Sequence, residues 1–159
     1  MINVQMHSTK RMVSEMQTSF NEPINCGCFN VRRAARKLTQ VYDRHLKPSG
    51  LQATQFTLLA MLADSQVHDG VLMTELAARM GMDRTTLTRN LAVAERPGWI
   101  EINQGVDRRQ RRIKLAAAGR ERLRKAMPLW RNAQDELEQA LGAASLNSLL
   151  KLTHRLDAL

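Results

Sequence analysis

Residues 73–99, MTELAARMGMDRTTLTRNLAVAERPGW, decide the fold of this chain. They predict two short helices joined by a tight turn at Gly81, because glycine adopts a positive φ without steric cost. Thr74 is the expected N-cap of the first helix and Asp83 that of the second, since both side chains can accept a hydrogen bond from a free backbone N–H. Two short helices around a glycine turn indicate a helix-turn-helix.

The second of these helices has two different faces. Three apolar residues recur at helical spacing and predict a buried face: Leu87, Leu91 and Ala94. The opposite face carries Arg84, Thr85, Thr88 and Arg89. We expect Thr85, Thr88 and Arg89 to contact base edges of DNA, with Arg84 and Asn90 nearby or on phosphates.

A β-hairpin is expected directly after the helix-turn-helix. Residues 99–102, WIEI, predict one strand and residues 113–115, IKL, a second strand. The ten residues between them form the hairpin tip and hold most of the basic run GVDRRQRRIKL at 105–115. A helix-turn-helix followed by such a hairpin predicts a winged helix.

The arginines of the hairpin suggest an anionic partner, because neighbouring like charges repel one another. Asp107 can pair with Arg109, two residues on, and hold it extended. The minor groove of DNA has a negative potential that attracts arginine, so we expect the wing to enter it. The flanking arginines are expected to meet phosphates: Arg108, Arg111 and Arg112.

The positive charge is concentrated rather than spread along the chain. The formal net charge of the whole chain is +9, and residues 84–125 alone carry 12 Lys+Arg against 4 Asp+Glu, or +8. Concentrated charge is typical of a nucleic-acid surface. The sequence has no apolar run of about 18 residues, which argues against a membrane span. With no secretory leader evident either, we expect a cytoplasmic protein without a membrane partner.

The rest of the chain predicts a mainly α protein with a small β-hairpin wing, in which helices for dimerisation flank a winged helix-turn-helix. Residues 1–24 read as a flexible arm, 25–47 as a first dimerisation helix, 48–116 as the DNA-binding domain and 117–159 as C-terminal dimerisation helices. The last helix is too apolar for a single small domain to cover. A second copy of the chain is its simplest partner, giving a homodimer.

Four segments resemble the MarR family of bacterial transcription regulators: GLQATQF at 50–56, MTELAARMGMDRTTLTRNL at 73–91, GWIE at 98–101 and DRRQRRIKLAAAG at 107–119. The resemblance covers about residues 28–158 and departs from the usual pattern at Arg96-Pro97 and Ala116. It implies a homodimer that binds near-palindromic double-stranded DNA, usually as a repressor. It also implies that Arg109 is the minor-groove arginine and Asp107 its orienting partner.

Both cysteines of the chain, Cys26 and Cys28, open the first predicted helix. A thiol at a helix N-terminus tends to have a lowered pKa and so to be reactive. The organic-peroxide sensors of the MarR family are similar here, with a cysteine followed by Phe and a tyrosine matching Tyr42. Arg32 stands where those sensors have a second tyrosine. Three interpretations stay open: Cys28 as a small buried apolar residue beside an exposed Cys26, a redox switch, and metal or persulfide chemistry.

The resemblance also implies a signal, because many members bind a small aromatic acid or phenol. Arg32 or Arg36 would suit the carboxylate or phenolate of such a ligand by bidentate pairing. We find no catalytic triad, phosphate-binding glycine loop or metal-ligand motif, and expect neither an enzyme nor a cofactor. The sequence therefore predicts a dimeric DNA-binding regulator, released by an aromatic ligand or, alternatively, by oxidation of Cys28. A non-specific architectural protein is a remote third alternative.

Overall fold

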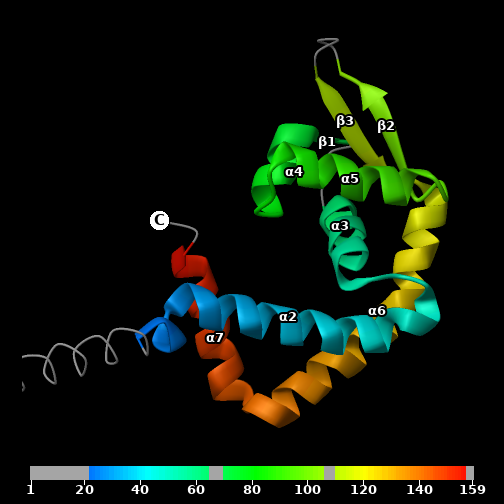
Figure 1. Ribbon diagram of the computed structural model, residues 1–159. Helices are drawn as coiled ribbons and strands as arrows, with labels where there is room; N and C mark the ends of the chain where they lie inside the picture. Colours follow the sequence, from blue (N-terminus) through cyan, green and yellow to red (C-terminus); the bar gives the residue numbers. More distant parts are fainter. Residues whose placement is uncertain (1–21, 65–69, 106–109, 157–159) are drawn as a thin grey trace, which may run out of the picture. The chain divides into compact units, whose positions relative to one another are not determined.

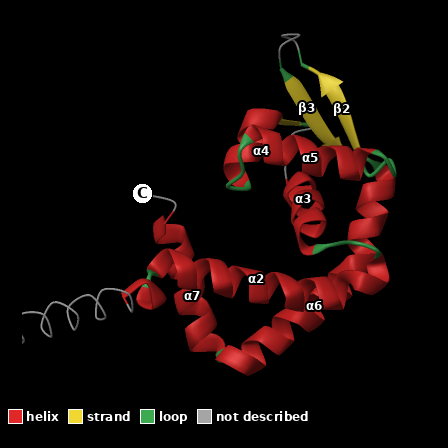
Figure 2. Cartoon of the chain, viewed as in Figure 1, coloured by secondary structure: helices red, strands yellow, loops and turns green. Residues whose placement is uncertain are grey.

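The computed structural model describes residues 22–64, 70–105 and 110–156 of the chain. Helices dominate, and the strands form one small sheet (Figure 1, Figure 2). This confirms the mainly α class with a small wing. The elements in chain order are η1 (Glu22–Asn25), α2 (Gly27–Leu46), η2 (Lys47–Ser49), α3 (Ala53–Asp64), β1 (Val71–Leu72), α4 (Met73–Arg79), α5 (Arg84–Glu95), β2 (Ile100–Gln104), β3 (Arg111–Leu115), α6 (Ala117–Leu141) and α7 (Ala143–Leu156).

The chain divides into two units, residues 1–40 and 41–159, which are described separately. In the first unit the described residues are η1 and the greater part of α2. Their side chains are largely exposed, including the apolar Ile24, Phe29 and Val31. In the second unit α3 to α6 surround the core, and α6 is followed by α7.

The helix-turn-helix forms as predicted around its turn. Gly81 has φ of 59°, the left-handed conformation that favours glycine. Asp83 caps α5, and its side chain accepts a hydrogen bond of 2.9 Å from the backbone N–H of Thr86. The expected cap of the first helix was wrong: α4 begins at Met73, its N-cap position is Leu72, and no side chain caps it. The chain passes straight from a strand into α4, which leaves Thr74 inside the first turn.

The sheet has three antiparallel strands in the order β1-β3-β2. β1 was not predicted; its pairing of Leu72 with Arg112 adds a strand beside the wing. The two wing strands extend further toward the tip than expected, with Asn103 opposite Arg112 and Gln104 opposite Arg111. Arg111 and Arg112, which were expected in the hairpin tip, therefore lie in the paired part of β3, where successive side chains face opposite sides of the sheet.

The core lies between α3, α5, the sheet and the first half of α6. Fully buried side chains come from several elements: Leu46, Leu58, Leu59, Val71, Leu76, Leu87, Leu91 and Ile113. Phe56 of α3 stacks on Trp130 of α6 with ring centroids 5.9 Å apart. The core therefore packs α5 against the strands of the wing.

The end of the chain is apolar but not buried. Gly142, with φ of 78°, ends α6 and α7 follows it. None of the described residues of α7 is buried, and Leu150, Leu152 and Leu156 are each about half exposed. No helix in the described part of the chain is long and apolar enough to cross a membrane.

Candidate nucleic-acid interface

The outward face of α5 is the first part of the candidate interface. Arg84, Thr85, Thr88 and Arg89 are all exposed, whereas Leu87, Leu91 and Ala94 are buried. The Thr88 hydroxyl donates a hydrogen bond of 2.7 Å to the carbonyl of Arg84, which orients its side chain along the helix. The 3.6-residue period of a helix separates these two sets, so burying the leucines turns the polar set outward.

Asn90 differs from its predicted neighbours on α5. It is partly buried, and its Nδ2 donates to the sulfur of Met82 at 3.4 Å. This contact ties the middle of α5 to the turn that precedes it. The structure therefore does not group Asn90 with the exposed face of Thr85, Thr88 and Arg89.

The end of β3 that lies next to the hairpin tip holds two adjacent arginines in different environments. Arg112 is half-buried, and its Nη1 donates to the carbonyl oxygen of Gly70 at 2.9 Å. Arg111 is exposed. Asp107, Arg108 and Arg109 lie outside the described residues, so their roles stay predictions.

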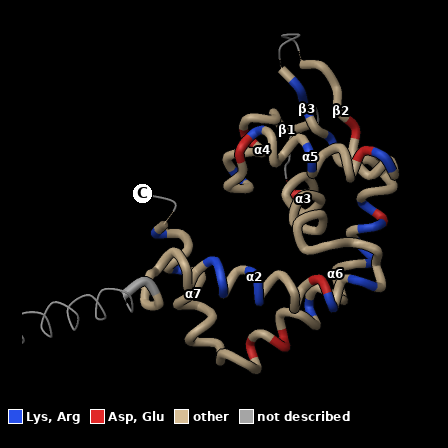
Figure 3. The backbone as a smooth tube through the Cα atoms, in the orientation of Figure 1, with Lys and Arg blue, Asp and Glu red and all other residues tan. Residues whose placement is uncertain are grey.

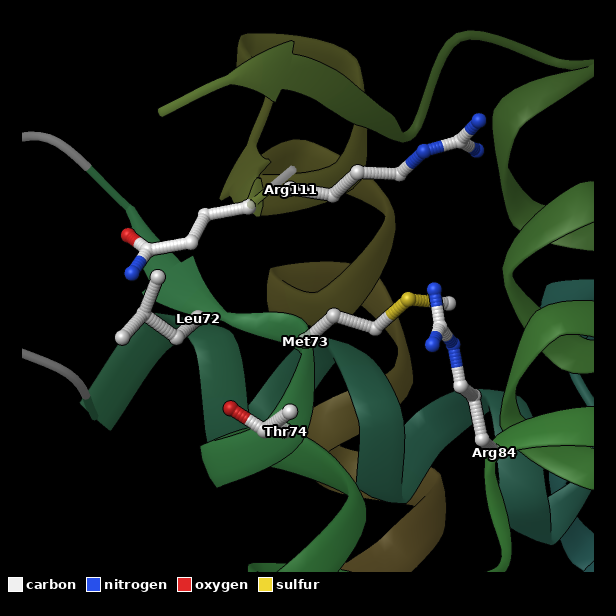
Figure 4. Close-up of a pocket in the computed structure, with 6 residues that line it drawn as sticks. Leu72, Met73, Thr74, Arg84 and Arg111 are labelled. Atoms are coloured by element: carbon white, nitrogen blue, oxygen red, sulfur yellow. The ribbon is translucent and has the colours of Figure 1, made fainter. Parts of the chain in front are cut away.

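A small cavity lies between the start of β3 and the start of α5 (Figure 4). Its volume is about 80 Å³. Six residues line it: Leu72, Met73, Thr74, Arg84, Gln110 and Arg111. Arg84 and Arg111 enter from α5 and from β3, and their guanidinium groups lie on the same side as the sulfur of Met73 (Figure 4). Sequence reasoning named both arginines but did not predict that they share a cavity with Thr74 and Gln110.

The start of α6 also carries basic residues, but several have partners within the chain. Arg122 donates to the carbonyl of Ser49 at 2.7 Å, and its guanidinium carbon lies 5.3 Å from the ring centroid of Trp99. Glu121 pairs with Arg124 and Lys125. The hydrogen bonds from Arg124 are the main reason that the pKa of Glu121 falls to about 2. Figure 3 accordingly shows mixed charges on α6, whereas the charged residues of β3 are all basic.

The candidate sensor residues lie on α2, except Cys26, which directly precedes it. Cys26 and Cys28 are both exposed free thiols, so the interpretation of Cys28 as a buried apolar residue is wrong for the single chain. Arg32 and Arg36 are exposed as well, and neither lines the cavity beside the wing. Tyr42, in the other unit, is partly buried, and burial raises the pKa of its hydroxyl. Among the described residues no group of three or more His, Cys, Asp or Glu could hold a metal ion.

Comparisons with known proteins agree with this geometry. The MarR family matches residues 49–110, which span the helix-turn-helix and the first strand of the wing, β2. The transcriptional repressor MprA of Escherichia coli K12 is 32% identical over 121 residues, covering 76% of this chain and 68% of the relative. The transcriptional regulator MosR of M. tuberculosis, solved in complex with DNA, is 46% identical with a TM-score of 0.73, covering 84% of this chain and 97% of that one.

A more distant structure shows the same fold. A mutant of E. coli MarR in complex with operator DNA is 24% identical with a TM-score of 0.73, covering 86% of this chain and 96% of that one. The relatives are transcription regulators rather than enzymes. Together with the winged helix described above, the MprA and MosR matches show that this chain belongs to the MarR family of winged-helix transcription regulators.

Proposed function

We propose that this protein is a homodimeric, sequence-specific DNA-binding repressor. The observation that carries the proposal is the exposed Arg and Thr face of α5, which the buried leucines of the same helix turn away from the core. The MosR structure, 46% identical and solved with DNA, supports the same partner for this chain.

In the proposed complex α5 enters the major groove of double-stranded DNA. Thr85, Thr88 and Arg89 contact base edges there, because hydroxyls and guanidinium groups match the donors and acceptors that bases present in that groove. The wing lies along the backbone, with Arg109 in the minor groove and Asp107 orienting it. Arg108 contacts phosphate, which fixes the position of the protein without reading sequence.

The proposed dimer follows from apolar surface that the chain leaves exposed. In the first unit this surface includes Ile24, Phe29 and Val31, and on α7 it includes Leu150, Leu152 and Leu156. Exposed apolar groups on a terminal helix commonly mark a contact with another chain. A two-fold dimer would place its recognition helices about one helical turn, roughly 10 base pairs, apart on a near-palindromic operator.

The repressor is proposed to release DNA in response to a signal. The first candidate is a small aromatic acid or phenol whose anionic group pairs with Arg32 or Arg36. The second candidate is oxidation of Cys28, and one observation favours it: the thiols of Cys26 and Cys28 are both exposed at the start of α2. An exposed thiol is accessible to an oxidant, whereas a buried one is protected.

The test of DNA binding uses the purified full chain and DNA from upstream of its own gene. Fluorescence anisotropy in reductant compares this duplex with a scrambled duplex of the same composition. A sequence-specific regulator should prefer its operator by about 10³-fold or more. Equal affinity for the two duplexes would instead support a non-specific architectural protein and refute the proposal.

The same assay separates the two signals. An organic hydroperoxide that releases the wild type but not Cys28→Ser identifies the thiol as the sensor. If peroxide has no effect, calorimetric titration of aromatic acids against the wild type and Arg36→Ala tests the ligand. Equal affinities for the two proteins would exclude Arg36 from the ligand site.

A further inference from the structure

The cavity between the wing and α5 is lined by two arginines that come from different elements, Arg111 from β3 and Arg84 from α5. Side chains alternate between the two faces of a strand, so Arg111 lies on the same face of β3 as the buried Ile113 and Leu115. That face packs against the helices, and Arg111 extends past its edge to the cavity where Arg84, the first residue of α5, also lies. Lys114, which is also exposed, lies between Ile113 and Leu115 in the strand and therefore faces the other side of the sheet.

Neither guanidinium group has an anionic partner among the described residues, and none of the six lining residues is acidic. The nearest acid along α5 is Asp83, whose carboxylate already accepts hydrogen bonds from the backbone N–H and the hydroxyl of Thr86. Two neighbouring cations without a counter-ion repel each other, and an anion bound between them relieves that repulsion. Thr74 and Gln110 add a hydroxyl and an amide that can donate to the same anion.

The size of the cavity restricts the anion. Its volume of about 80 Å³ is far below the roughly 300–1,000 Å³ of pockets that enclose drug-sized ligands. A single tetrahedral oxyanion on an extended chain suits such an open recess, because only the group itself enters it. Arginine pairs well with phosphate oxygens through its planar fork of donors.

The position of the cavity indicates that the bound group is a phosphate of the DNA backbone. In DNA the sugar-phosphate strand separates the major groove from the adjacent minor groove. A protein that places α5 in one groove and the wing in the other must straddle that strand, and the cavity lies between these two elements (Figure 4). We infer that Arg84 and Arg111 clamp one backbone phosphate of the operator in each half-site. This inference rests on the proposed DNA-binding function and adds to it the residues that hold the backbone between the grooves.

The test compares Arg111→Gln and Arg84→Gln with Lys114→Gln, a control that removes the same charge from the opposite face of β3. Affinity for the upstream and scrambled duplexes is measured by anisotropy between 50 and 200 mM salt. Each lost phosphate contact lowers the slope of log affinity against log salt by about 0.9, or about 1.8 for two subunits. Over this fourfold range the salt-induced loss of affinity therefore shrinks about tenfold for Arg111→Gln, and stays at its wild-type value for Lys114→Gln.

Two further results are expected from a phosphate contact. Arg111→Gln weakens binding to both duplexes by the same factor, since phosphates carry no sequence information. Replacing single phosphates by neutral methylphosphonates weakens wild-type binding at one position per half-site. The double variant Arg84→Gln with Arg111→Gln is insensitive at that position. Because the side chains of Arg84 and Arg111 are exposed and make no hydrogen bond or ion pair with the described residues, circular dichroism should show unchanged folding.

The outcomes distinguish this inference from the function on which it rests. If the wild type prefers the upstream duplex but Arg111→Gln and Lys114→Gln have equal salt slopes, the phosphate clamp is refuted and the proposed function stands. If Arg111→Gln instead loses preference for particular bases, Arg111 reads sequence and the clamp is also wrong. If the wild type binds neither duplex, both proposals fail.

Discussion

Gly119 lies where α6 closely approaches the root of the wing at Trp99 and Leu115. A Cβ built on it would overlap the carbonyl oxygen of Trp99, and would lie 2.9 Å from the carbonyl carbon of Trp99 and 2.8 Å from Cδ1 of Leu115. The Trp99 oxygen is held in place because it accepts a hydrogen bond of 3.0 Å from the N–H of Ala116. We therefore expect Gly119→Ala to destabilise the fold, although alanine is the better helix former.

The two opposing effects can be compared. Alanine in place of glycine in a helix interior contributes up to about 1 kcal/mol of stability. Overpacking a tight contact costs about 1–3 kcal/mol, and the upper end applies here because the obstacle is backbone rather than a mobile side chain. The expected net loss is about 2 kcal/mol, which for a chain of 159 residues lowers the melting temperature by about 4–8 °C.

Urea unfolding monitored by circular dichroism, at one fixed protein concentration, measures this loss. Gly27→Ala is the matched control, because its Cβ would meet nothing within 4 Å. The control should unfold at the wild-type midpoint or slightly above it. A midpoint for Gly119→Ala equal to or above that of the wild type would refute the close approach of α6 to Trp99.

Four further predictions concern the interface and the dimer. Asp83→Ala should lower the melting temperature and weaken DNA binding, because α5 loses its N-cap. Asp83→Asn keeps a side-chain acceptor and should retain most of the stability. A melting temperature of Asp83→Ala equal to that of the wild type would contradict the capping role. Hydrogen bonding lowers the pKa of Asp83, so its ionised cap stabilises the fold fully above the unfolded value of 3.8 and is lost as pH falls through the lower folded pKa; acid titration of Asp83→Asn should lack that loss. Arg112→Met should lower the unfolding midpoint in urea, because its bond to the Gly70 carbonyl is lost; an unchanged midpoint would refute its anchoring role. Leu152→Glu should shift sedimentation toward a monomer, whereas Asn147→Glu, which adds the same charge to another part of α7, should remain a dimer; identical sedimentation of the two variants would remove α7 from the interface.

Helical periodicity gave most of the fold, because the buried residues of α5 and α6 recur at regular spacing along the sequence. The start of α4 could not be found in the same way. Val71 and Leu72 form a strand of two residues, too short to show any alternation, and it exists only because β3 pairs with it. Because the chain passes directly from this strand into α4, the N-cap position falls at Leu72, and Thr74 lies inside the first turn of the helix. The long-range pairing of β1 with β3 thus set the start of α4 and overrode the local preference of threonine for an N-cap position.

The basic run of the wing shows what the sequence could have revealed. Arg111 and Arg112 were given the same role because both are arginines beside a predicted tip. In the structure, however, β3 begins at Arg111, and successive side chains of a strand point to opposite faces of the sheet. Because Ile113 and Leu115 are buried, the odd-numbered residues of β3 lie on the core face and the even-numbered ones on the opposite face. Arg111 then shares the face that borders the helices and reaches the cavity, whereas Arg112 lies on the other face and bonds to Gly70. The alternation was readable in the sequence, but the start of the strand was not. The position at which β3 begins matters because it distinguishes Arg112, which bonds to Gly70 and anchors the wing, from Arg111, which is exposed and available to DNA.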